Sequence, residues 1–110
     1  ICRSGASTCA ELACIGRPAF FVPYALATDD HQTANARALV AAGGGWMTAQ
    51  AQFDAARLAA SITGWLDAPA ALQAAAAAMR ACGRPEAAER LADAVCDLVA
   101  GRGNAQESAA

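Results

Sequence analysis

Two polar segments of the sequence combine residue types that suit a phosphate-containing ligand. The first reads Arg-Ser-Gly-Ala-Ser-Thr-Cys-Ala-Glu over residues 3–11. A glycine loop that opens a helix presents backbone N–H groups and the positive helix end, which suits a phosphate or diphosphate. The hydroxyls of Ser4, Ser7 and Thr8 would add hydrogen-bond donors. One turn into the helix, the carboxylate of Glu11 could accept hydrogen bonds from the vicinal hydroxyls of a ribose, as acidic residues do in dinucleotide folds.

The same segment has a second interpretation. Thr8 and Glu11 have the (S/T)xxE spacing of a capping box, in which the two side chains satisfy backbone N–H groups at a helix start. On chemistry alone, the capping box is the preferred interpretation of this spacing.

The second polar segment is Asp-Asp-His-Gln-Thr-Ala-Asn over residues 29–35. We expect it between a strand and a helix, where open α/β sheets bind ligands. The amide of Gln32 could donate to and accept from sugar hydroxyls. The alternative is that Asp30 caps the helix and Gln32 is solvated. His31 could act as a general base, although a solvated histidine is the commoner role.

The elements around these segments predict an α/β arrangement. Ile1-Cys2 has the character of a strand end, and the helix after the first loop should run to about Ile15 and stop at Gly16. The apolar, proline-bounded run 18–23 predicts a buried parallel strand. A loop over 24–30, a helix over 31–42 closed by three glycines and a short strand at 46–48 should follow.

From Asp54 onward the pattern predicts helices only. Asp54 should cap the first, with a buried face formed by Leu58, Ile62, Trp65 and Leu66. Pro69 should start the second, which should end at Gly83. Pro85 should lie in the first turn of the last helix, whose apolar stripe is Leu91, Val95, Leu98 and Val99.

Composition narrows the classes of protein. The chain has 110 residues, 34 of them alanine, and a formal net charge of −2 with no arginine cluster. This balance argues against a nucleic-acid partner. Five cysteines without metal-ligand spacing indicate a reducing cytoplasm and no metal site. No apolar run is long enough to span a bilayer. Because the chain begins with Ile1, we expect a fragment of a longer protein.

Together, these motifs resemble the C-terminal, donor-binding domain of the MurG family of bacterial N-acetylglucosamine transferases. The resemblance is carried by residues 3–13, Gly16-Arg17-Pro18, Phe21-Val22-Pro23, the run 29–36 and the run 83–91. It implies a partial Rossmann-like C-terminal domain of a GT-B glycosyltransferase over residues 1–100, followed by C-terminal helices, with a disordered tail over 101–110.

The resemblance also implies a function. The donor would be UDP-N-acetylglucosamine, and the acceptor, lipid I, would bind through a domain absent from this chain, as would the cytoplasmic face of the inner membrane. The chain alone should be inactive. The catalytic base is unknown and should lie in that absent domain; no cofactor is expected. The donor contacts would be Ala6, Ser7, Thr8, Cys9, Ala10, Glu11 and Gln32, with Gly5 and His31 as further candidates.

Two other classes stay open at this point. Other UDP-sugar enzymes of the same fold, such as diacylglycerol glycosyltransferases or the UDP-N-acetylglucosamine 2-epimerase, place a glycine loop and an acidic residue at this helix. A non-enzymatic, alanine-rich helical interaction module would instead use Glu11 as a cap and leave Gln32 solvated.

Overall fold

A small parallel sheet lies at the centre of the computed structural model, which describes residues 1–26 and 28–101. Strands β1 (Ala19–Phe21) and β2 (Gly45–Met47) pair in parallel. Phe21 is also bridged in parallel to Cys2, so β1 lies between β2 and the N-terminal segment. The predicted α/β class and the order strand, helix, strand are therefore confirmed.

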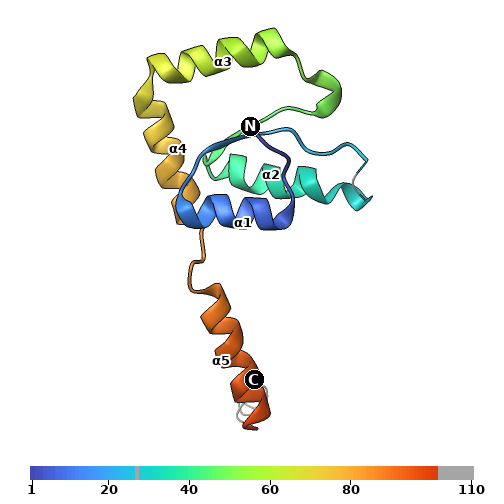
Figure 1. Ribbon diagram of the computed structural model, residues 1–110, viewed down its shortest axis with the longest axis vertical. Coiled ribbons are helices and arrows are strands. Elements are labelled where there is room, and N and C mark those ends of the chain that lie inside the picture. Colours follow the sequence, from blue (N-terminus) through green and yellow to red (C-terminus); the bar gives the residue numbers. More distant parts are fainter. Residues whose placement is uncertain (27, 102–110) are drawn as a thin grey trace.

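Two helices connect the successive strand segments (Figure 1). Helix α1 (Ala6–Ile15) ends at Gly16, whose left-handed φ of 67° a residue with a side chain rarely adopts. Helix α2 (His31–Ala41) follows a 3-10 turn over Thr28–Asp30 and ends before the three glycines. Both helix ends match the sequence prediction.

The buried core lies where β1 meets α1, α2 and α4 (Pro69–Ala81). Phe21 and Met79 are its largest fully buried side chains. Small residues surround them because the helices approach the sheet and each other closely. The core cluster consists of Cys9, Ala13, Ala19, Phe21, Ala36, Leu39 and Met79.

Gly45 permits the close pairing of the two strands. A Cβ atom at this position would overlap the carbonyl oxygen of Ala19, its partner in the register. Since that oxygen belongs to the backbone, a side chain here could be accommodated only by moving β2 away from β1.

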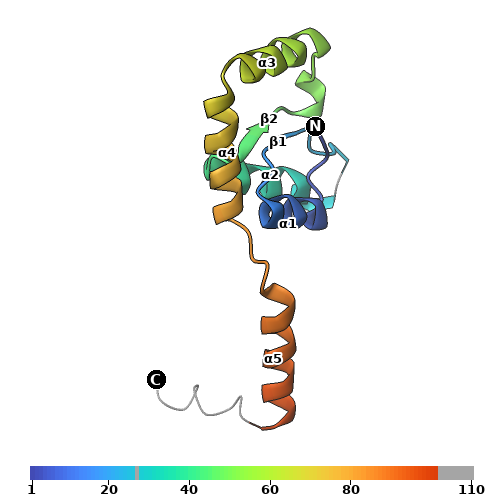
Figure 2. The same ribbon diagram turned by 60° about the vertical axis from the view of Figure 1, so that its left-hand side comes forward.

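Helix α3 (Ala55–Asp67) covers the other side of the strands, after a 3-10 turn over Gln50–Gln52 (Figure 2). Asp54 caps it as predicted, with a carboxylate oxygen 2.7 Å from the N–H of Arg57. Trp65 stacks on Trp46 at 4.3 Å between ring centroids and contacts Phe20 at 5.9 Å. Leu66, predicted to share this face, is instead 70% exposed, because it lies on the outer side of the helix.

Helix α5 (Ala87–Val99) projects away from the remaining elements in both views. Its predicted stripe exists on the helix but is not buried: Leu91 and Leu98 are each 67% exposed. Pro85 precedes the N-cap, Glu86, so its prediction in the first turn is wrong. Pro69, in contrast, starts α4 as predicted. The predicted disordered tail lies, beyond Gly101, outside the described residues.

Within the described part of the chain, the helices are all too short or too polar to cross a membrane.

Candidate functional site

The carboxyl ends of the three parallel segments meet at one edge of the sheet. Arg3 lies there and forms hydrogen bonds to the residues that follow β1 and β2. Its Nη1 donates to the carbonyl oxygens of Val22 at 3.0 Å and Pro23 at 3.2 Å. The same nitrogen donates to Oε1 of Gln50 at 2.8 Å, beyond β2. The guanidinium also lies over the ring of Tyr24, 5.4 Å from its centroid. These contacts fix the relative positions of the loops that leave this edge.

The first loop leaves the N-terminus of α1 open. Gly5 is the N-cap in an extended conformation, and no side chain caps the helix. The first helical hydrogen bond runs from the N–H of Cys9 to the carbonyl of Gly5, so the N–H groups of Ala6, Ser7 and Thr8 lie outside the helical ladder. These groups and the helix dipole can attract an anion.

The capping-box interpretation is wrong. Thr8 is the third residue of α1 and not its N-cap, because the helix begins three residues earlier than that interpretation requires. Glu11 consequently lies in the second turn, where its side chain is exposed. It is on the same helix end as the open N–H groups, and its carboxylate is available to an external donor.

Ser4, expected to offer its hydroxyl to a ligand, is turned inward instead. It is fully buried, and Oγ donates to the carbonyl oxygen of Gln32 at 2.7 Å. Asn35 donates from Nδ2 to the carbonyl oxygen of Ser4 at 3.1 Å. The reason is tertiary: α2 passes beside the loop and supplies both partners, so these contacts join residues about 30 positions apart.

Gln32 lies at the second loop and is half-buried, not solvated as the alternative interpretation required. Its Oε1 accepts from the backbone N–H groups of Ser4 at 3.2 Å and Tyr24 at 3.0 Å. The amide therefore links the loop before α1 to the loop after β1. The sequence contained no local signal for this link, because both donors are backbone groups.

His31 is exposed beside two aspartates in left-handed backbone conformations. Asp29 and Asp30 have φ values of 53° and 54°. Asp30 is the N-cap of α2 by position, but its side chain makes no capping hydrogen bond, contrary to the interpretation of it as a side-chain cap. The Nε2 atom of His31 is 3.8 Å from a carboxylate oxygen of Asp29, with both side chains largely in solvent.

Cys9 belongs to the core more than to the ligand surface. Burial, and secondarily the neighbouring Cys2, raises the pKa of its thiol above the ordinary value of 9.0. The thiol therefore stays protonated at neutral pH and is a poor nucleophile. Ala10, the next residue, is exposed on the surface of α1.

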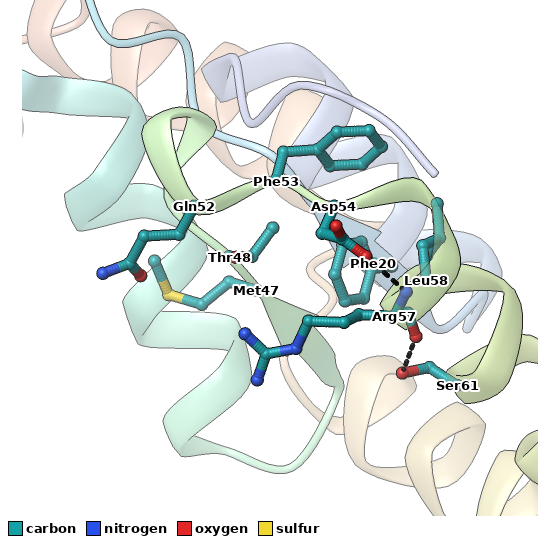
Figure 3. A pocket seen from close by; sticks show the side chains of 9 residues that line it. All are labelled: Phe20, Met47, Thr48, Gln52, Phe53, Asp54, Arg57, Leu58 and Ser61. Atoms are coloured by element: carbon teal, nitrogen blue, oxygen red, sulfur yellow. Dashed lines mark hydrogen bonds between the residues drawn. The ribbon is translucent and has the colours of Figure 1, made fainter.

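Two cavities lie elsewhere on the molecule. One, of about 430 Å³, is lined by Ile1, Cys2, Arg3, Val22, Gln50 and Phe53. The other, of about 240 Å³, lies between the strands and α3, with Phe20, Met47 and Arg57 among its lining residues (Figure 3). None of the predicted donor residues lines either cavity.

Helix N-termini grouped at the carboxyl end of a parallel sheet define the ligand-binding part of an open α/β domain. The sequence profile of the glycosyltransferase family 28 C-terminal domain matches residues 1–93. The chain belongs to this family.

Known relatives agree with that assignment. The chain is 57% identical over 106 residues to the UDP-N-acetylglucosamine--N-acetylmuramyl-(pentapeptide) pyrophosphoryl-undecaprenol N-acetylglucosamine transferase of Rhodospirillum centenum, covering 96% of this chain and 28% of that protein. It is 50% identical over 99 residues to the protein of the same name from Paramagnetospirillum magneticum, covering 90% and 27%.

A solved structure gives the same result for the fold. The crystal structure of Acinetobacter baumannii MurG matches with a TM-score of 0.75 and 36% identity, over 84% of this chain and 27% of that one. The chain therefore has the fold of the C-terminal GT-B domain predicted from the sequence. It spans about a quarter of the length of these relatives.

Proposed function

We propose that this chain is the donor-binding part of an inverting glycosyltransferase. The full enzyme would transfer N-acetylglucosamine from UDP-N-acetylglucosamine to the C4 hydroxyl of N-acetylmuramic acid on lipid I, giving lipid II and UDP. The observation that carries the proposal is the open N-terminus of α1, with Glu11 exposed beside it, in a chain of this family. The names of the relatives supply the donor and the acceptor.

The donor would lie across the two loops. The N–H groups of Ala6, Ser7 and Thr8 would face the diphosphate, with Gly5 allowing close approach and Cys9 and Ala10 completing the turn. Glu11 would accept hydrogen bonds from the ribose hydroxyls. Gln32, with His31 beside it, would meet the N-acetylglucosamine ring.

The chemistry follows from this placement. As the acceptor oxygen bonds to the anomeric carbon, the bond to the diphosphate breaks and negative charge grows on the leaving oxygen. Backbone N–H groups already directed at that position stabilise the charge without reorganising. The base that takes the hydroxyl proton, the lipid I contacts and the peripheral attachment to the cytoplasmic face of the inner membrane are assigned to other parts of the transferase.

Glu11→Ala tests the proposal. The experiment uses a chimaera in which this chain replaces the matching segment of the full-length Rhodospirillum centenum transferase. A hydrogen bond to a charged group is worth about 1.5–3 kcal/mol, so the KM for UDP-N-acetylglucosamine should rise about 10- to 100-fold.

Glu89→Ala is the matched control, because Glu89 is also an exposed glutamate near a helix N-terminus, on α5. It should leave the donor KM unchanged. If Glu11→Ala alters neither the donor KM nor kcat, the ribose assignment is wrong.

A further inference from the structure

Ser4 occupies a position that the proposed donor contacts do not explain. Among the described residues it is the one buried polar side chain, and it directly precedes Gly5, the N-cap of α1. All three of its polar groups are bonded to α2: the N–H to Gln32 Oε1, Oγ to the Gln32 carbonyl and the Ser4 carbonyl to Asn35 Nδ2. One residue thus joins the N-terminal ends of both helices.

The orientation of the Gln32 amide follows from these bonds. Two backbone N–H groups, of Ser4 and Tyr24, point at one end of the amide, and only its oxygen can accept from both. Both lone pairs of that oxygen are then in use. The opposite end is the NH₂ group, which finds no acceptor among the described residues and can only donate.

We propose that Ser4 is a positioning residue that sets the donor specificity of this surface through Gln32. It holds the amide so that the NH₂ group alone meets the sugar, whose hydroxyl must accept the hydrogen bond. It also sets the distance between the diphosphate end at α1 and the sugar end at α2. The inference rests on the proposed function, since it takes the ligand to be a nucleotide sugar.

The test compares binding of the whole donor with binding of its nucleotide part. In the chimaera, KM is measured for UDP-N-acetylglucosamine and the inhibition constant for UDP, which lacks the sugar. Ser4→Ala removes the hydrogen bond from Oγ to the carbonyl oxygen of Gln32. The donor KM should therefore rise about fivefold. The UDP inhibition constant and the acceptor KM should stay near the values of the unsubstituted chimaera.

Gln32→Glu separates the two roles of the amide, which are to accept from backbone N–H groups of the protein and to donate to the sugar. A carboxylate oxygen still accepts from the N–H groups of Ser4 and Tyr24, so the thermal midpoint should be preserved. The outward NH₂ is lost, and the donor KM should rise more than the fivefold expected for Ser4→Ala, again without a comparable change for UDP.

Thr63→Ala is the matched control for Ser4→Ala. Thr63 also donates a hydroxyl to a backbone carbonyl, that of Ala59 at 3.1 Å, but within α3 and away from the loops. It should change neither the donor KM nor the UDP inhibition constant.

Asn35→Asp is a second variant in case Ser4→Ala does not fold. It removes the donor to the Ser4 carbonyl and should show the same selective rise in the donor KM.

The outcomes separate the two levels of inference. If Gln32→Glu weakens the donor selectively but Ser4→Ala and Asn35→Asp weaken UDP equally or change only the thermal midpoint, the positioning role is wrong and the proposed function stands. If Gln32→Glu and Glu11→Ala both leave donor binding intact, the donor surface itself is wrong.

Discussion

The N-termini of α1 and α2 both lie at the carboxyl edge of the same sheet, yet they offer a ligand different groups. At α1 an extended Gly5 leaves backbone N–H groups without a side-chain cap. At α2 the backbone turns through two left-handed aspartates, and Gln32 uses its amide oxygen inside the protein. Backbone donors suit any diphosphate, whereas a single oriented NH₂ distinguishes among sugars. Under the proposed function, we therefore expect the N-terminus of α1 to supply affinity for the donor and that of α2 to supply selectivity for its sugar.

Gly45→Ala should displace the N-termini of α1 and α2 together. It has the largest expected effect. Its Cβ would collide with the backbone of Ala19, so β2 must separate from β1, on which both loops are built. We expect a loss of about 3 kcal/mol in the free energy of unfolding, measured by denaturant titration of the chimaera.

Gly64→Ala is the control for that substitution. Gly64 lies inside α3 with no atom within 4 Å of an added Cβ. Alanine should stabilise this helix by up to about 1 kcal/mol. Equal effects of the two substitutions would contradict the steric role of Gly45.

Gln32→Ala should sharpen the contrast between the two helix ends. Without the amide, the enzyme should discriminate about fivefold less between UDP-N-acetylglucosamine and its C4 epimer, the value of one neutral hydrogen bond. The measurement is the ratio of kcat/KM for the two donors. Mutant and parent chimaeras with the same ratio would exclude Gln32 from sugar selection.

His31→Ala should have the smallest effect. The pair with Asp29 is exposed and 3.8 Å long, and such pairs contribute at most about 1 kcal/mol. Both kcat and the donor KM should change less than twofold. A loss of kcat of a hundredfold or more would instead make His31 a general base and overturn the division of roles between the helix ends.

Two helices of equal length show how far a hydrophobic pattern predicts packing. Both α4 and α5 have 13 residues and an apolar face. In α4, Ala75 and Met79 are buried against the sheet, whereas every residue of α5 is exposed. A periodic apolar stripe defines which face of a helix can be buried. Whether another element lies against that face depends on where the preceding chain places the helix.

The sequence alone determined the parts of this protein that depend on neighbouring residues. Gly16 ends α1, Asp54 caps α3 and Pro69 starts α4, because each acts on backbone groups within four positions. The motif at residues 3–11 likewise identified the glycine loop and Glu11 as candidates.

Only the tertiary structure decided what the polar side chains of the candidate site do. From its residue type, Ser4 could have offered its hydroxyl to a ligand, and the spacing of Thr8 and Glu11 was compatible with a capping box. In the structure, the Ser4 hydroxyl donates to α2 and Thr8 is not the N-cap. The orientation of the Gln32 amide depends on N–H groups of Ser4 and Tyr24, which are 28 and 8 positions away. A hydroxyl or an amide can both donate and accept, so its role follows from the partners that folding brings within hydrogen-bond distance.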